Sequence, residues 1–340
     1  MPPHGPPGDE SRAAARWGAV FGALVVLLIF VLVQNPPDRF LGGPSEDAPS
    51  DVAPEVSASP EAFGESRAVR LQLALPNEEF LFPLQVAGDP AALAYRWVRA
   101  DDSAAVAPPA PLASARVRAP SVPGFFRLEI AEADAGRTIL DSLLVGVMVP
   151  YGAKIGSSLN GYRIGNYRWE RNAVDAPPPP RGFVEVTESS RTLAVSQHLQ
   201  LEDFLTHDDQ ARWPRYVALD PRILDKVELV IALVALWRGK QDRDVQVDVH
   251  SGFRTPLHNR RVPRAALDSR HQFGDAADVA VDADGDGRIT YRDAVTVGLA
   301  AEQIERDHPD LVGGIGVYGN FGGAPYVHLD VRGTRARWKR

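Results

Sequence analysis

The chain has 340 residues and a formal net charge of −7 at pH 7, with 44% hydrophobic and 24% charged residues. This composition supports a sizeable buried core in about two domains, and the acidic balance argues against nucleic acid as a main partner. Because cysteine is absent, disulfides and thiolate metal sites are excluded, and any metal must be held by His, Asp and Glu.

Three segments precede the first predicted domain. Residues 1–16 are rich in proline and glycine, which predicts a disordered cytoplasmic tail. Residues 17–34 are apolar and uncharged, which predicts one membrane helix. A cleaved signal peptide is the alternative, but no small-residue cleavage site follows the apolar run. Residues 35–66 are rich in Pro, Ser, Ala, Gly and acidic residues, so they are predicted to form a linker.

The orientation of the predicted membrane helix follows from its flanking charges. Arg12 and Arg16 precede the apolar run and Arg39 follows it. This small excess favours a cytoplasmic N-terminus, because positive charges are enriched on the cytoplasmic side. We therefore expect the rest of the chain to lie outside the cytoplasm, in the periplasm.

Residues 67–150 contain short apolar runs with partial alternation, separated by turn sequences such as PNE, GDP and SVPG. Short strands at this spacing predict a small β-sandwich, which we expect to be immunoglobulin-like. This segment has no constellation of catalytic residues, so we expect it to act in spacing or binding.

The remaining residues, 151–340, contain both helical and strand patterns. Apolar residues at helical spacing predict a helix over 221–237, which Gly239 is placed to end. Alternation predicts a strand over 245–249. Ser196 is interpreted as the N-cap of a short helix rather than as an active-site group.

Two separate segments offer metal ligands. His271 and Asp278 lie in SRHQFGDAAD, and His328 lies in YVHLD. Alternation in DVAVD and YVHLDV predicts two strands that each present a ligand on one face. Two imidazoles and one carboxylate are ligands that zinc accepts, and an open fourth position makes such a site catalytic. The alternative for the first segment is a polar turn that leads into a strand.

These motifs resemble those of a known family. The set SGFRTPLHN, SRHQFGDAAD, GGIGVYG and YVHLD, within roughly residues 152–332, is similar to the zinc peptidases that include D-Ala-D-Ala carboxypeptidases and murein endopeptidases. Their signature is S-x-H-x-x-G-x-A-x-D, followed far downstream by a second histidine. The resemblance implies Zn²⁺ bound by His271, Asp278 and His328, and peptidoglycan stem peptides as substrate. Arg254 matches the family's arginine, which implies that it orients substrate or stabilises charge on the scissile carbonyl.

The resemblance also implies an α+β fold. We expect a zinc-peptidase domain with a small antiparallel sheet over residues 151–340, preceded by the β-sandwich and the single N-terminal membrane helix. The predicted function is a membrane-anchored zinc D,D-carboxypeptidase or murein endopeptidase. The alternative is a non-catalytic peptidoglycan-binding or scaffold protein that keeps the peptidase fold.

The general base is an open point in this assignment. Many relatives have a glutamate a few residues before the last histidine, or a second histidine two residues before it, and Tyr326 occupies the latter position here. Asp330 is the candidate, either for activating the water or for orienting His328. His250 is a weaker alternative base.

Residues 282–293, DADGDGRITYRD, fit the calcium-loop pattern of an EF-hand. Aspartate stands at the last position, where the pattern has glutamate. The alternatives are a solvated acidic turn before a helix, or a calcium-dependent adhesion module that includes the β-rich segment. If Ca²⁺ binds here, we expect it to stiffen the strand that presents Asp278. The ligands would be the side chains of Asp282, Asp284, Asp286 and Asp293 and the carbonyl of Arg288.

Overall fold

The computed structural model describes residues 56–58, 63–86, 93–112, 116–132, 136–319 and 323–340. The predicted tail and membrane helix, residues 1–34, lie outside these ranges, as does most of the predicted linker. Among the helices of the described part, none is long and apolar enough to cross a membrane.

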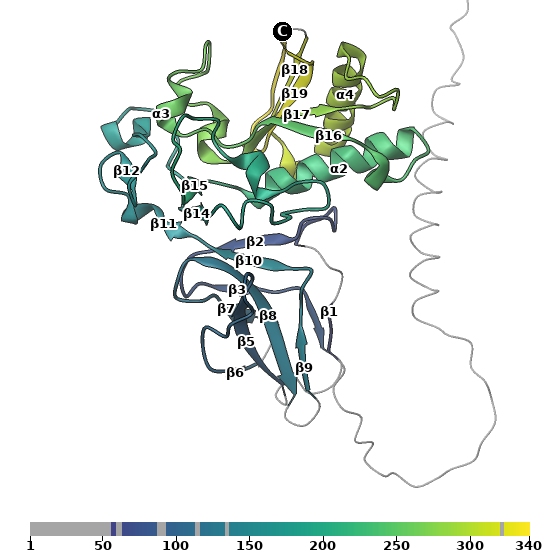
Figure 1. The fold of residues 1–340 in the computed structure, drawn as a ribbon. Helices are drawn as coiled ribbons and strands as arrows, with labels where there is room; N and C mark the ends of the chain where they lie inside the picture. Colours follow the sequence, from purple (N-terminus) through teal and green to yellow (C-terminus); the bar gives the residue numbers. More distant parts are fainter. Residues whose placement is uncertain (1–55, 59–62, 87–92, 113–115, 133–135, 320–322) are drawn as a thin grey trace, which may run out of the picture. The chain divides into compact units, whose positions relative to one another are not determined.

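The β-rich segment is built around a six-stranded sheet (Figure 1). Most of its pairs are antiparallel, but β2 and β10 run parallel. The segment is β-rich as predicted, while its immunoglobulin-like topology and its limits as a domain stay predictions. The sheet has the order β2 (Leu71–Ala74), β10 (Leu144–Val147), β8 (Gly124–Glu132), β5 (Leu93–Arg99) and β6 (Ala110–Pro111), with β9 (Gly136–Ile139) on β8. Two further pairs are β1 (Val56–Ala58) with β4 (Leu84–Val86) and β3 (Glu79–Leu81) with β7 (Arg116–Arg118).

A second sheet of five strands carries the predicted metal ligands. Its pairs are antiparallel except the last, where β20 runs parallel to β18. The expectation of an antiparallel sheet is therefore corrected at this edge. The order is β16 (Val247–Ser251), β17 (Ala276–Val281), β19 (Tyr326–Asp330), β18 (Gly314–Tyr318) and β20 (Ala336–Lys339).

Smaller elements complete this part of the chain, so the mixed α+β class is confirmed. The strands are β11 (Val149–Pro150), β14 (Gly182–Val186) and β15 (Arg215–Val217) in one sheet, and β12 (Ser158–Leu159) with β13 (Tyr162–Arg163) in another. The α-helices are α2 (Pro221–Trp237), α3 (Pro256–Asn259) and α4 (Tyr291–Asp307). The 3-10 helices are η2 (Tyr151–Ala153), η3 (Arg168–Arg171), η4 (Leu201–Phe204), η5 (Asp242–Asp244), η6 (Arg270–Phe273) and η7 (Pro309–Leu311).

The predicted helix over 221–237 is confirmed with both of its ends. Asp220 caps the first turn by accepting a hydrogen bond from the Arg222 N–H, and Gly239 follows the helix in a left-handed conformation. The predicted helix capped by Ser196 is wrong. Only the one turn of η4 forms, with Gln200 rather than Ser196 as its N-cap, and the Ser196 hydroxyl donates to the buried carboxylate of Glu228.

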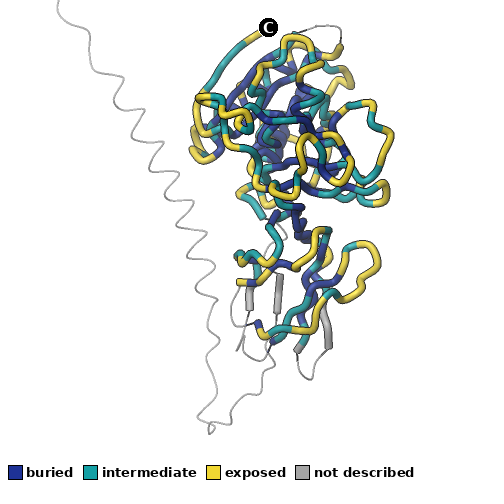
Figure 2. Tube along the Cα trace, turned by 90° about the vertical axis from the view of Figure 1, so that its left-hand side faces the viewer, coloured by how far each residue is buried: buried dark blue, intermediate teal, exposed yellow. Residues whose placement is uncertain are grey.

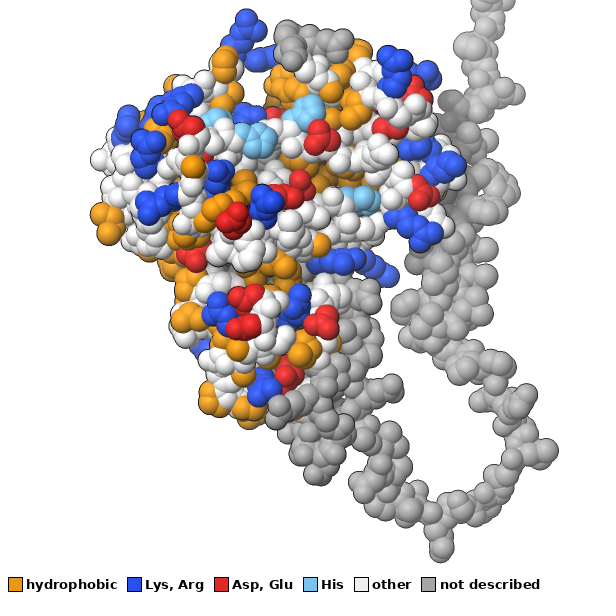
Figure 3. Space-filling model, in the orientation of Figure 1, with side chains coloured by type: hydrophobic (Ala, Val, Ile, Leu, Met, Phe, Trp, Pro, Cys, Tyr) orange, Lys and Arg blue, Asp and Glu red, His pale blue; other side chains and the backbone are white. Residues whose placement is uncertain are grey.

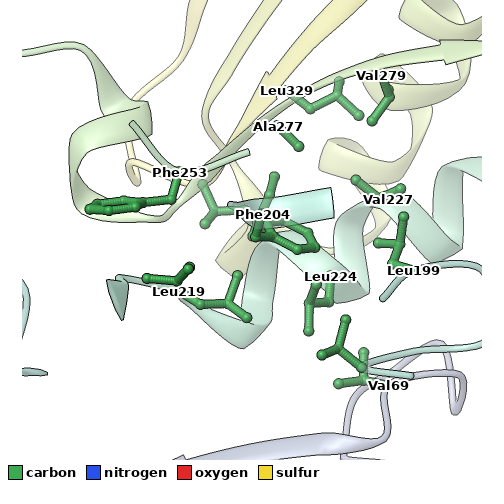
Figure 4. Close-up of a cluster of buried hydrophobic side chains, with 14 of the residues drawn as sticks. Val69, Leu199, Phe204, Leu219, Leu224, Val227, Phe253, Ala277, Val279 and Leu329 are labelled. Carbon is green, nitrogen blue, oxygen red and sulfur yellow. The ribbon is translucent and has the colours of Figure 1, made fainter. Parts of the chain in front are cut away.

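One face of the five-stranded sheet packs against helices α2 and α4. Figure 4 shows Ala277, Val279 and Leu329 among the apolar side chains that this face shares with α2, including Val227. The core strands are buried and the exposed residues lie mostly on connecting loops (Figure 2). Because side chains alternate along a strand, the residues between these apolar ones point to the opposite face. Asp278 and His328 are among them.

Gly274 shapes the turn that leads from η6 into β17. Its φ is +74°, and a Cβ there would lie 2.1 Å from the carbonyl oxygen of Ala218. We expect Gly274→Ala to lower the free energy of unfolding by at least about 2 to 3 kcal/mol, from backbone strain and a clash with main-chain atoms. Chemical denaturation measures this loss. Gly152→Ala is the control, because a Cβ there meets no atom within 4 Å, and equal stability of both variants would contradict the prediction.

Candidate metal centre

The three predicted ligands converge on one point. Asp278 of β17 lies directly opposite His328 of β19, and His271 comes from η6 just before β17. The His328 Nδ1 is 2.8 Å from the Asp278 Oδ1 and 3.1 Å from the His271 Nε2. The His271 Nε2 is also 3.2 Å from the Asp278 Oδ1. One ligand atom from each residue thus lies within 4.8 Å of the others.

Hydrogen bonds on the outer side of each ring fix which nitrogen faces this point. The His271 Nδ1 donates to the carbonyl of Gly252 at 2.6 Å, so its Nε2 presents a lone pair to the cluster. The His328 Nε2 lies 3.1 Å from the Asp330 Oδ2, which leaves Nδ1 on the inner side. Both imidazoles are therefore oriented as metal ligands before any cation arrives.

The charge states of the cluster suit a divalent cation. Burial lowers the pKa of His271, which keeps its imidazole neutral. Burial opposes charge on Asp278 and His328 as well. His271 and His328 nevertheless hold the pKa of Asp278 well below its usual range, and hydrogen bonds to the carboxylates of Asp278 and Asp330 raise the pKa of His328. Metal ligands must be deprotonated, so cation binding here would compete with protonation of His328. A set of two imidazoles and one carboxylate fits zinc.

Arg254 is tied to the ligand set. Its Nη2 donates to the Asp278 Oδ2 at 2.6 Å, and its Nε donates to the Ser251 hydroxyl at 2.8 Å. This bond occupies the outer oxygen of Asp278 and leaves Oδ1 for the cluster. The side chain also lines the adjoining cleft, a position from which it could reach a bound substrate. Its contact with substrate stays a prediction.

Asp330 lies behind His328 rather than beside the converging atoms. Its side chain is fully buried, and it accepts hydrogen bonds from the Gly314 N–H at 2.8 Å and the Arg332 Nε at 2.8 Å. Burial would raise the pKa of Asp330, but His328 and Arg332 hold it far below its usual range. A fully buried carboxylate whose charge is stabilised by these partners is suited to orient His328. This geometry favours the orienting role over the role of general base.

Lys226 is a buried residue that sequence reasoning missed. It lies in α2 with no solvent exposure, and its Nζ donates to the Glu305 carboxylate at 2.6 Å and to the carbonyl of Asp330 at 2.7 Å. The lysine therefore fixes the main chain of the residue that orients His328. A charged residue within the apolar face of the predicted helix was the available signal.

A cleft of about 1100 Å³ opens beside the cluster and is lined by Arg254, His271, Asp278 and His328, among others. One part of its lining is aromatic: Tyr318 stacks on Tyr326 with 4.5 Å between ring centroids. Trp338 donates from Nε1 to the Tyr318 hydroxyl at 2.8 Å. Figure 3 shows histidine side chains on one face of the surface, with both acidic and basic side chains near them.

His250 is half-buried near this aromatic group. Its ring centroid lies 5.5 Å from that of Tyr326, and its Nε2 is 3.3 Å from the Asp248 carboxylate. It does not line the cleft with the three ligands. Its role as an alternative base stays a prediction.

The acidic loop, residues 282–293, brings together some of the predicted calcium ligands. Carboxylate oxygens of Asp282, Asp284 and Asp293 lie within 4.8 Å of one another, whereas Asp286 is outside this group. The Asp293 carboxylate accepts hydrogen bonds from the N–H groups of Ala283 and Thr290 at 3.0 and 2.8 Å. It thereby serves as the N-terminal capping box of α4. Calcium binding by this loop, with the Arg288 carbonyl, stays a prediction.

His198 forms a separate hydrogen-bond network with Glu228 and Asp242, away from the three metal ligands. The His198 Nδ1 is 2.6 Å from the Glu228 carboxylate, and its Nε2 is 3.1 Å from the carbonyl of Asp242. Burial lowers the pKa of His198, but these acceptors outweigh burial and raise it. Since the folded pKa exceeds the unfolded value of about 6.5, the stabilisation is full below that pH and is lost as pH rises through the folded pKa.

We expect His198→Gln to remove this pH dependence. At acidic pH the variant should lose about 1.5 to 3 kcal/mol, the usual contribution of a hydrogen bond to a charged group, and it should approach the parent above the folded pKa. Urea unfolding of both proteins across pH measures the difference. A difference that stays constant with pH would contradict the assignment of a charged His198.

The family comparison covers part of this site. Residues 196–297 match the model of the family described as Peptidase M15. The matched range includes Arg254, His271 and Asp278, while His328 lies beyond it. No curated protein matches the chain.

Proposed function

We propose that this protein is a zinc-dependent metallopeptidase that cleaves the D-amino-acid-containing peptide stems or crosslinks of peptidoglycan. The match of residues 196–297 to the Peptidase M15 family supports this proposal. The observation that carries the proposal is the convergence of His271, Asp278 and His328 at one side of a cleft of about 1100 Å³. A cavity of this size accommodates several residues of a peptide. Cleavage of a terminal residue and cleavage of a crosslink are both compatible with such a cleft.

Each residue of the site has a proposed role. His271, Asp278 and His328 would hold the ion, and zinc when bound supplies Lewis-acid chemistry that activates water and polarises a carbonyl. Arg254 would stabilise charge that develops on the scissile carbonyl, because its guanidinium lines the cleft beside Asp278. Asp330 would keep His328 in the tautomer that binds metal.

A second candidate function follows from the carboxylates of the cleft. Within the described residues, its lining contains only two acidic side chains, Asp268 and Asp278. Asp278 belongs to the ligand set, and Asp268 is paired with Arg168. The lack of a free carboxylate beside the cluster favours the alternative of a peptidoglycan-binding protein that does not cleave.

Digestion of peptidoglycan separates the two candidates. The zinc-loaded full chain should release peptide fragments from purified sacculi, which mass spectrometry of the soluble products detects and chelation suppresses. Binding of the zinc-loaded chain to sacculi without release of fragments would reject the peptidase and support the binding protein.

Anchoring by residues 17–34 and a periplasmic location for the rest of the chain belong to the same proposal. The supporting observation is the uncharged apolar length of that segment. Protease added to intact spheroplasts should degrade the C-terminal part while the chain stays in the membrane fraction. Recovery of the chain in the cytosolic fraction would reject the anchor.

Calcium binding by residues 282–293 is the remaining part of the proposal. The acidic loop begins at Asp282, directly after β17 and about four residues after Asp278, so bound calcium would stiffen that strand. We expect added calcium to raise both the unfolding temperature and the zinc affinity, and Asp284→Asn to reduce both effects. If calcium changes neither quantity, the loop is a solvated turn.

A further inference from the structure

The cleft is rich in arginine although the chain carries a net charge of −7. Three of its arginines are neutralised by nearby carboxylates: Arg254 by Asp278, Arg270 by Asp275, and Arg332 by Asp330. The other acidic residue of the lining, Asp268, is paired with Arg168. The five arginines of the lining are Arg254, Arg264, Arg270, Arg332 and Arg340.

Among the described residues, Arg264 and Arg340 are the two arginines of the lining that are not paired with a carboxylate. In the part of the chain that the structure describes, neither guanidinium has an ion pair or a hydrogen bond, and both line the cleft. A cation bound by the triad of His271, Asp278 and His328 would add further positive charge to the cleft. Two guanidinium groups that line the same cleft without an ion pair to a described residue add to the positive potential around such an ion, and a bound anion would lower that potential.

The two arginines come from different elements of the cleft wall. Arg264 lies in the loop between α3 and η6, and its φ of +59° is unusual for a residue other than glycine. Such a conformation is strained and occurs often at ligand-binding positions. Arg340 follows β20, where its main chain bonds to Val317 and Gly319. Its charge acts on Tyr326, two residues from His328.

We propose that Arg264 and Arg340 form an anion subsite that binds a carboxylate of the substrate. Guanidinium groups suit carboxylates because they donate paired, charge-assisted hydrogen bonds. The inference rests on the proposed function and narrows it: preferred substrates carry a carboxylate within reach of the triad. That carboxylate belongs either to the C-terminus of the peptide or to an acidic side chain.

Three synthetic stem peptides that differ in one group test the subsite. The first has a free C-terminal carboxylate and free side-chain carboxylates, the second has a C-terminal amide, and the third has amidated side chains. Binding of fluorescently labelled peptides to the full chain gives Kd, and fragment release by the zinc-loaded chain gives kcat/KM. Arg264→Gln and Arg340→Gln are compared with Arg260→Gln, a control at an exposed arginine of the same loop that is absent from the lining.

The subsite predicts a preference that the two variants lose. We expect one of the amidated peptides to bind at least about tenfold more weakly than the free acid, which also identifies the source of the carboxylate. Each variant should bind the free acid about tenfold more weakly but bind that amide unchanged, and Arg260→Gln should behave as the parent. Equal Kd values for all three peptides would overturn the subsite. If the zinc-loaded parent chain releases no fragments but still binds the free acid more tightly than that amide, the peptidase is rejected and the subsite is retained.

Discussion

We expect His271→Ala to abolish zinc binding and to reduce fragment release from peptidoglycan by a factor on the order of 1,000 or more. The substitution removes one of three ligand atoms that lie within 4.8 Å of one another, and loss of the metal removes both the Lewis acid and the activated water. Zinc content by elemental analysis and product release by mass spectrometry measure the two effects. A variant that retains zinc and activity would reject the mechanism.

Loss of folding is the competing explanation for an inactive variant. The His271 imidazole is fully buried and donates to the Gly252 carbonyl, so its removal also leaves a cavity and an unpaired acceptor. Circular dichroism and the unfolding temperature should show that the variant remains folded. His207→Ala, at an exposed histidine outside the site, is the matched control, and we expect it to keep both zinc and activity.

Local periodicity accounts for the part of the site that was predictable. Alternation in DVAVD and YVHLDV placed Asp278 and His328 on polar faces of strands, and both strands form as β17 and β19. An apolar stripe likewise predicted α2. In each case the signal and the structure lie within a few residues of one another, so composition and spacing determine the outcome.

Features that depend on distant partners were not predictable in the same way. Lys226 and Glu305 are 79 residues apart, and nothing near Lys226 in the sequence shows that a buried carboxylate will meet it. Ser196 has a sequence suited to an N-cap, but Glu228 is 32 residues away and takes its hydroxyl. The parallel pairing of β20 with β18 also follows from tertiary placement. Local preference yields to such contacts because a buried charge or donor must be paired.

The same reasoning gives Asp330→Asn the second-largest expected effect. The Asp330 carboxylate accepts a hydrogen bond from the His328 Nε2–H at 3.1 Å. This bond requires a proton on Nε2 and leaves Nδ1 free for metal. An asparagine can turn its amide oxygen toward Arg332 and donate from its NH₂ group to Nε2. This would favour the opposite tautomer, with a proton on Nδ1 facing the metal. We expect zinc affinity to fall about 10- to 100-fold, and fragment release to fall with it.

Zinc affinity decides between the two roles considered for Asp330. If Asp330 were the general base, Asp330→Asn would reduce kcat while zinc affinity stayed at the parent value. If it orients His328, saturating zinc should restore much of the lost activity, because the chemistry itself does not use the carboxylate. Competition with a fluorescent chelator measures the affinity, and Asp310→Asn, at an exposed aspartate of η7, is the control. The buried position of Asp330 behind His328 leads us to expect the second result.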